Sequence, residues 1–119
     1  MMITVIAMLF LAMGLGALIV PRTFLAVFDI QAGTAAARNE IQAVYGGYGV
    51  AMCALLWWSR QQPQWAEGIW LTVGVALAGM AAGRLVGLVR EPTRRWPVWL
   101  FLGIEAGLAL VLCRQAGVI

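Results

Sequence analysis

The residues most able to do chemistry in this sequence are polar side chains that stand inside or beside long apolar runs. Glu40, Arg84 and Glu105 are ionisable, and Gln42 and Tyr45 add an amide and a phenol. A charged group near the centre of a membrane helix costs about 2.5–3.5 kcal/mol on insertion scales, so such residues are rare there and often mark a functional site. These five side chains are therefore candidates for binding a proton or a small ligand.

The two acids and the arginine are expected to meet in one half of the membrane. Glu40 and Arg84 lie at similar depths because their helices run antiparallel, and Glu105 lies roughly 12 Å from the same side at the rise of a helix. Pairing removes most of the cost of burying separate charges. We predict that Arg84 pairs with Glu40, Glu105 or both, and Arg38 could add positive charge from the interface. The cluster either fixes helix register or lines a pocket for a ligand or proton.

The composition places the chain in a membrane. Hydrophobic residues make up 63% of it and charged residues 11%, whereas a soluble chain is about a quarter charged. The mean hydropathy is +0.90. Every basic residue is arginine, and most of them lie between apolar runs, which is typical of membrane topology and not of nucleic-acid binding. The lipid bilayer is the expected partner, and no nucleic acid is expected.

Four apolar segments of spanning length follow one another along the chain. They are too long for spanning strands and do not alternate, and a helix satisfies its own backbone hydrogen bonds in lipid. The sequence therefore predicts an all-α fold in which one domain, 1–119, forms an integral membrane four-helix bundle. The expected spans are 3–20, 38–59, 68–89 and 97–114.

The connection between the first two spans is expected to hold a short amphipathic helix in the membrane interface. Phe24, Val27 and Phe28 have the i, i+3, i+4 spacing of one helical face, which favours such a helix. Thr34 is the expected N-cap of a helix that begins near Ala35, because its side-chain oxygen can accept from a backbone N–H of the first turn. Arg38 and Glu40 would then be helical and near the interface.

The arginines predict the orientation. Five lie in the first and third connections, and two lie in the second connection and near the C-terminus. The positive-inside rule puts the first and third connections in the cytoplasm. We therefore expect a multi-pass protein of the bacterial cell inner membrane with both termini outside the cytoplasm. The first group is Arg22, Arg38, Arg90, Arg94 and Arg95, and the second is Arg60 and Arg114.

Small residues repeat at the spacing that lets membrane helices approach closely. Two stripes of glycine stand on the third and fourth spans, and Gly47, Ala51 and Ala54 form a similar strip on the second. We expect these stripes to pack the bundle, and the sequence leaves open whether one of them joins copies of the chain into a homo-oligomer. The helix-packing candidates are Gly46, Gly47, Gly79, Gly83, Gly87, Gly103 and Gly107.

Three short segments, 39–47 (NEIQAVYGG), 83–85 (GRL) and 103–105 (GIE), resemble the motifs of a family of small bacterial four-helix membrane proteins of unknown function. That family looks related to the DoxX-like membrane proteins, and the resemblance covers essentially the whole chain. A basic residue often precedes the Ala-x-Tyr-Gly-Gly run in that family, where this chain has Gln42. DoxX-like relatives suggest redox-associated or quinone-linked roles by analogy only. The resemblance assigns the family motifs to Glu40, Tyr45, Gly46, Gly47, Arg84 and Glu105.

These patterns leave two classes of function open and disfavour a third. The first is a small membrane protein that binds or transports a proton, a small solute or a lipophilic ligand at the polar cluster. The alternative is a non-catalytic structural or accessory subunit that assembles with other membrane proteins through glycine-rich helix faces. An enzyme is disfavoured, because the chain has no His, no metal-ligand spacing and no Ser or Cys with a visible base. We expect no cofactor, no metal and no catalytic residue.

Overall fold

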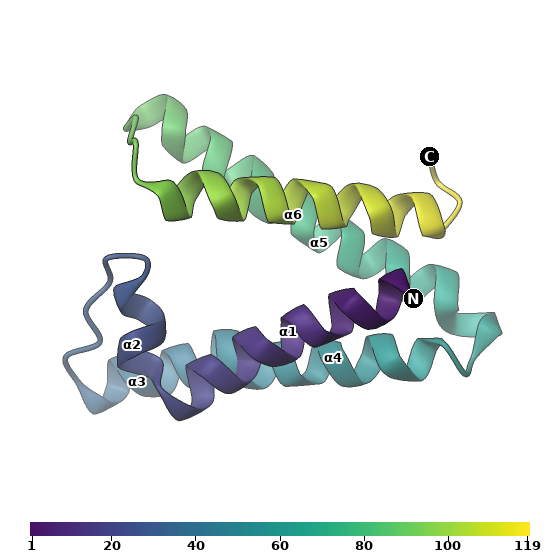
Figure 1. The fold of residues 1–119 in the computed structure, drawn as a ribbon, viewed down its shortest axis with the longest axis horizontal. Helices are drawn as coiled ribbons and strands as arrows, with labels where there is room; N and C mark the ends of the chain where they lie inside the picture. Colours follow the sequence, from purple (N-terminus) through teal and green to yellow (C-terminus); the bar gives the residue numbers. More distant parts are fainter. The chain divides into compact units, whose positions relative to one another are not determined.

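The computed structural model describes residues 1–119, and it is helical throughout except for short connections (Figure 1). It contains no strand, so the predicted all-α class is confirmed. The helices are α1 (Met2–Ile19), α2 (Pro21–Ala26), α3 (Ala35–Ile41), the π-helical segment η1 (Gln42–Gly47), α4 (Tyr48–Ser59), α5 (Pro63–Arg90) and α6 (Trp96–Gln115).

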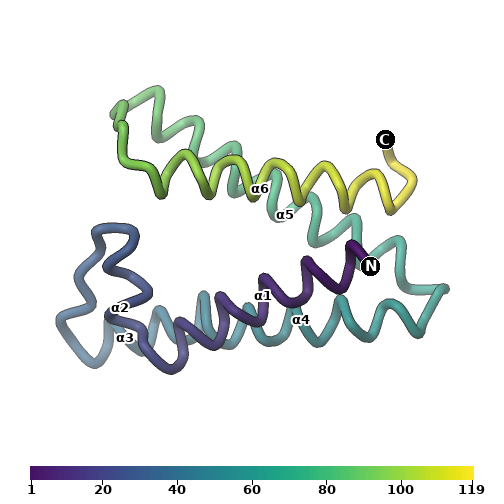
Figure 2. The backbone as a smooth tube through the Cα atoms, in the orientation of Figure 1, coloured from purple at the N-terminus to yellow at the C-terminus, as the bar shows by residue number.

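The chain divides into two compact units, Met1–Gln61 and Gln62–Ile119. In the first unit, α1 runs back along η1 and α4, and in the second unit α5 packs against α6. The backbone trace shows each unit as a helical hairpin whose long helices lie side by side (Figure 2). The single domain 1–119 expected from the sequence stays a prediction.

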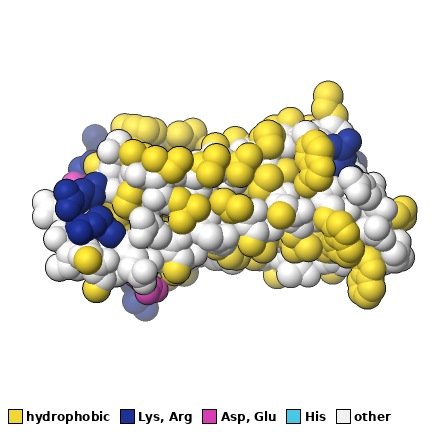
Figure 3. Space-filling view, turned by 90° about the horizontal axis from the view of Figure 1, so that it is seen from below, with side chains coloured by type: hydrophobic (Ala, Val, Ile, Leu, Met, Phe, Trp, Pro, Cys, Tyr) yellow, Lys and Arg dark blue, Asp and Glu magenta, His cyan; other side chains and the backbone are white.

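Three helices, α1, α5 and α6, are long and apolar enough to cross a membrane. Hydrophobic side chains cover much of the face shown in Figure 3, and many large apolar residues are exposed, among them Val75, Leu85 and Leu110. Lipid can cover such surfaces, whereas water would leave them unfavourably hydrated. These helices are therefore compatible with a membrane protein.

The predicted span 38–59 is helical along its length but is divided among α3, η1 and α4. Ile41 and Gly47 stand at the two junctions, and both have right-handed helical dihedral angles. The backbone therefore continues through the junctions, while η1 replaces i→i−4 hydrogen bonds with wider i→i−5 turns. This segment is not one regular spanning helix, and a bundle of four spanning helices stays a prediction.

A short helix, α2, stands where the interfacial helix is expected, but it ends at Ala26, so Val27 and Phe28 of the expected face lie beyond it. Pro21 occupies its first turn, where proline is favoured because it lacks the N–H that would have no partner there. Leu25 is buried and Phe24 is half-buried. The N-cap of α3 is confirmed, because Thr34 Oγ1 accepts a hydrogen bond of 3.1 Å from the backbone N–H of Ala37.

The closest helix approach in the first unit depends on glycines of α1, η1 and α4. A Cβ atom placed on Gly49 would lie 2.7 Å from the Phe10 carbonyl oxygen and 2.8 Å from the Gly14 Cα. A Cβ atom on Gly46 would lie 2.7 Å from the Leu18 Cγ. Gly46 therefore packs as predicted, while the sequence analysis missed Gly14 and Gly49.

In the second unit, the packing glycine of α5 is Gly74. A Cβ atom there would lie 3.0 Å from the Cys113 Sγ and 3.1 Å from the Leu112 Cβ of α6. A Cβ atom placed on any glycine of the predicted stripes would meet no atom within 4 Å. These glycines therefore do not pack α5 against α6. Their packing against any other helix stays a prediction. The glycines of these stripes are Gly79, Gly83, Gly87, Gly103 and Gly107.

Candidate functional site

The central feature of the candidate site is an ion pair that joins α5 to α6. Arg84 donates from Nε to Glu105 Oε2 at 2.7 Å and from Nη2 to Glu105 Oε1 at 2.8 Å. The Glu105 side chain is 5% exposed and the Arg84 side chain 25% exposed. The Arg84 guanidinium carbon lies 5.7 Å from the centre of the Phe101 ring. The predicted pairing of Arg84 with Glu105 is therefore confirmed.

This geometry is that of a bidentate ion pair. Both carboxylate oxygens of Glu105 accept hydrogen bonds from one planar guanidinium, which gives the pair a defined orientation as well as a strong attraction. No buried side-chain nitrogen or oxygen in the chain lacks a hydrogen-bond partner. The pair can fix the register of α5 against α6, and both oxygens that would hold a proton or a ligand are already engaged.

Glu40, the other predicted partner of Arg84, is an exposed residue of α3. It belongs to the first unit, whereas Arg84 belongs to the second. A contact between Glu40 and Arg84 therefore stays a prediction. Within the second unit, Glu105 accepts both of the guanidinium hydrogen bonds described above.

Gln42 begins η1 and connects it to the end of α1. Its Nε2 donates a hydrogen bond of 3.2 Å to the Leu18 carbonyl oxygen, which belongs to the last turn of α1. Carbonyls of a last turn have no partner within their own helix. Gln42 therefore caps α1 from the side, and this contact gives its amide a structural role.

Tyr45 lies in an aromatic cluster beside this cap. The centre of its ring is 5.6 Å from that of Phe24, and the Phe24 ring is 5.8 Å from that of Phe28. Tilted rings at these distances attract one another beyond the area that they bury. The cluster holds α2 against η1 within the first unit, whereas Arg84 and Glu105 belong to the second unit.

Arg38 is engaged in the connection between α2 and α3. Its Nη1 donates a hydrogen bond of 3.1 Å to the carbonyl oxygen of Ala32, a buried residue. The same connection turns at Asp29, which has a φ of 60°, a left-handed conformation that Asp adopts more readily than most residues. Arg38 therefore helps to fix this turn, and a further role as a charge partner stays a prediction.

Replacing Gln42 with leucine is expected to lower the free energy of unfolding by about 0.5–1.5 kcal/mol, the usual net value of one hydrogen bond. Leucine keeps the size of the side chain and removes only the donor to the Leu18 carbonyl. Thermal unfolding in detergent, followed by far-ultraviolet circular dichroism, measures the change. Gln64→Leu is the matched control, because Gln64 bonds only to the nearby Gln62 side chain. Equal losses of stability in Gln42→Leu and Gln64→Leu would show that Gln42 does not cap α1.

Sequence reasoning missed two partners of the predicted site residues. Phe101 stands four residues before Glu105, and residues at that spacing share one side of a helix. That spacing could have shown that an aromatic ring accompanies the ion pair. The Leu18 carbonyl that Gln42 caps has no such signal, because every residue carries a backbone carbonyl.

The profile of a protein family described as Domain of unknown function (DUF4345) matches residues 1–114. The chain is a DUF4345 protein. The match covers both hairpins of the DUF4345 chain, including the Arg84–Glu105 pair and η1. The predicted membership of a family of unknown function is thereby confirmed, and the relation to DoxX-like proteins stays a prediction. Comparisons of this DUF4345 chain with curated proteins and with solved structures found no match.

Proposed function

We propose that this DUF4345 protein is a non-catalytic membrane protein whose hairpins assemble with other membrane helices through smooth, small-residue faces. The observation that carries this proposal is the closed Arg84–Glu105 pair. Because the charges inside the second hairpin satisfy one another, they serve register and leave no open polar site there. The glycines of the two predicted stripes in the same hairpin stay uncovered within it; they are Gly79, Gly83, Gly87, Gly103 and Gly107.

The position of the small residues on α5 supports assembly. At about 100° per residue, Gly79 and Gly83 lie on the side of α5 opposite to Leu77 and Ala81, which are buried. Lipid gives two helices no hydrophobic drive to associate, so close backbone contact through small residues is the main attraction available. An outer face made of glycine suits a further helix better than it suits lipid.

The first hairpin offers a matching surface. Gly47, Ala51 and Ala54 are all exposed, and they follow one another at helical spacing on η1 and α4. We propose that such faces complete a four-helix bundle in which the run from α3 to α4 acts as the fourth span. The same faces suit contacts with a second copy of the chain or with another membrane protein.

We propose the inner membrane as the location, with both termini outside the cytoplasm. Arg90, Arg94 and Arg95 at the turn between α5 and α6 are exposed, and Arg114 stands alone near the other end of α6. This asymmetry is the one that the positive-inside rule uses. Exposed Trp96 and Trp99 follow this arginine-rich turn at the start of α6, as expected for a headgroup region.

The binding of a proton or a polar solute is the competing proposal. It would need Glu40, Gln42, Tyr45 and the ion pair to line one pocket. Gln42 instead caps α1, and the Tyr45 ring packs on Phe24. These contacts favour assembly over polar ligand binding, because Gln42, Tyr45 and the ion pair already have structural partners.

Replacing Gly83 with leucine tests the proposed function. Leucine would fill the smooth face of α5 and separate it from any helix packed there, at a cost of at least about 1 kcal/mol. Val89→Leu is the matched control, because Val89 is exposed on another side of the same helix and gains only one methylene group. The measurements are thermal unfolding in detergent at two protein concentrations and chemical cross-linking in native membranes.

The two measurements separate the partners of the Gly83 face. A lower melting temperature that does not depend on concentration would show packing within the four-helix bundle. Loss of cross-linked species without a change in monomer stability would show packing between chains. If Gly83→Leu behaves like Val89→Leu in both measurements, the assembly proposal is wrong.

A further inference from the structure

The turn between α5 and α6 carries three arginines and one acid, Glu91, which gives it a net charge of +2. Arg90, Arg94 and Arg95 all fall within this connection or at its edges and are exposed. Hydrogen bonds hold the turn in shape: Thr93 Oγ1 accepts from the Arg95 backbone N–H at 3.3 Å, and the Thr93 carbonyl accepts from Trp99 Nε1 at 3.0 Å. The arginines therefore project from a defined loop, which we call the basic turn (90–95).

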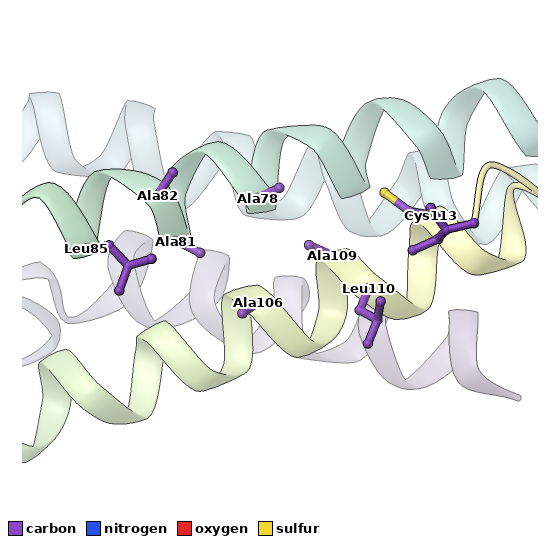
Figure 4. A pocket seen from close by; sticks show the side chains of 9 residues that line it. Ala78, Ala81, Ala82, Leu85, Ala106, Ala109, Leu110 and Cys113 are labelled. Atoms are coloured by element: carbon purple, nitrogen blue, oxygen red, sulfur yellow. The ribbon is translucent and has the colours of Figure 1, made fainter.

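An apolar groove of about 370 Å³ runs along the same hairpin (Figure 4). Alanines of α5 and α6 form most of its lining, and these small side chains leave the space between the helices unfilled. Leu85, Leu110, Cys113 and Ile119 complete its walls, and no charged side chain lines it. A groove of this kind suits a hydrocarbon chain and offers no hydrogen bond to a polar ligand.

The groove and the basic turn follow one another along the length of the hairpin. Ala106 follows Trp99 by seven residues, so both lie on one side of α6, with Trp99 about 10 Å nearer the turn. Leu85, at the near end of the groove, precedes Arg90 by five residues, which is about 7.5 Å along α5. The exposed indole of Trp99 thus lies between a positive loop and an apolar groove, at the position that interfacial tryptophans favour.

We propose that the α5–α6 hairpin binds an anionic phospholipid, with the phosphate at the basic turn and an acyl chain in the groove. The arginines complement a headgroup of net negative charge, and basic residues beside a membrane attract such lipids. The apolar groove favours a lipid over a free phosphate, because a free phosphate has no acyl chain to place in it. This inference goes beyond assembly, since neither the basic turn nor the groove includes the Gly83 face.

The headgroup part of the proposal is tested on the full-length protein in detergent by native mass spectrometry. Dioleoyl phosphatidylglycerol should bind more tightly than dioleoyl phosphatidylcholine. Arg94→Gln/Arg95→Gln should weaken phosphatidylglycerol binding by about 25-fold, at about fivefold for each arginine. Arg94→Lys/Arg95→Lys keeps the charge and should stay within about threefold of the original protein.

Arg114→Gln is the matched control for charge, because Arg114 is exposed at the other end of α6. It should change phosphatidylglycerol binding by less than about threefold. Equal binding of the two lipids, or equal losses for Arg114→Gln and the double glutamine variant, would overturn the proposal. Circular dichroism confirms that each variant keeps its helices.

The groove part of the proposal is tested with Ala106→Phe. A phenyl ring there displaces at least one or two methylene groups of an acyl chain, each worth about fourfold in affinity. Phosphatidylglycerol binding should therefore fall by at least about fourfold, whereas Ile104→Phe, on another side of α6, should leave it unchanged. Soluble glycerophosphoglycerol should not compete with the lipid at equal concentration. If it competes equally, or if the two phenylalanine variants behave alike, the groove holds no lipid.

Discussion

Replacing Arg84 with methionine is expected to lower the free energy of unfolding by about 3–5 kcal/mol. The Glu105 side chain is only 5% exposed and loses both of its hydrogen bonds in this variant. Removing one partner of a buried ion pair leaves the other charge uncompensated, and that is the main part of the cost. Methionine keeps most of the apolar stem of Arg84, so packing changes little. Unfolding by SDS in mixed micelles, followed by circular dichroism, measures the loss.

Two further variants isolate the ion pair. Arg84→Met/Glu105→Met removes both charges and is expected to recover most of the lost stability, because apolar pairs often replace buried ion pairs at little cost. Arg90→Met removes an exposed arginine of the same helix and should change stability by less than about 0.5 kcal/mol. If Arg84→Met costs no more than Arg90→Met, the pair does not hold α5 to α6.

The Arg84–Glu105 pair could be predicted because two simple constraints act on it. Lipid makes isolated charges costly, and the constant rise of a helix fixes the depth of each residue from the sequence alone. Depth does not fix which helix faces which. Glu40 has a suitable depth as well, yet its contact with Arg84 depends on how two hairpins are arranged, which residue spacing does not reveal.

The internal geometry of the second span could not be predicted because of η1. A helix with 3.6 residues per turn from Arg38 to Gly49 would put Arg38, Gln42 and Tyr45 near one face. A π-helical stretch has wider turns and shifts the phase of all residues beyond it. The structure gives these three side chains different partners: the Ala32 carbonyl, the Leu18 carbonyl and the Phe24 ring.

The glycine predictions show a similar limit. Repeats such as Gly79–Gly83–Gly87 identify a smooth helix face but not the helix that covers it. The contacts that the structure does show use Gly14, Gly49 and Gly74, which stand outside those repeats. The all-helical class follows from composition and length, whereas the choice of packing partner depends on long-range fit that spacing does not encode.

Replacing Gly49 with alanine is expected to lower the free energy of unfolding by about 3 kcal/mol, the upper end of the range for overpacking. The added methyl carbon would lie 2.7 Å from the Phe10 carbonyl oxygen and 2.8 Å from the Gly14 Cα. Both obstacles are backbone atoms of α1, so no change of rotamer relieves the clash. The helices α1 and α4 must move apart, and apolar contacts along the hairpin weaken with them.

Gly47→Ala is the matched control, two residues earlier in the chain. Its methyl carbon would meet only the Gln42 carbonyl oxygen at 3.9 Å, an ordinary contact. Alanine is about 0.5–1 kcal/mol more favourable than glycine inside a helix, so this variant should be slightly more stable than the original protein. Thermal unfolding of both variants in the same detergent checks the opposite signs. A Gly49→Ala protein as stable as Gly47→Ala would show that α1 and α4 do not approach this closely.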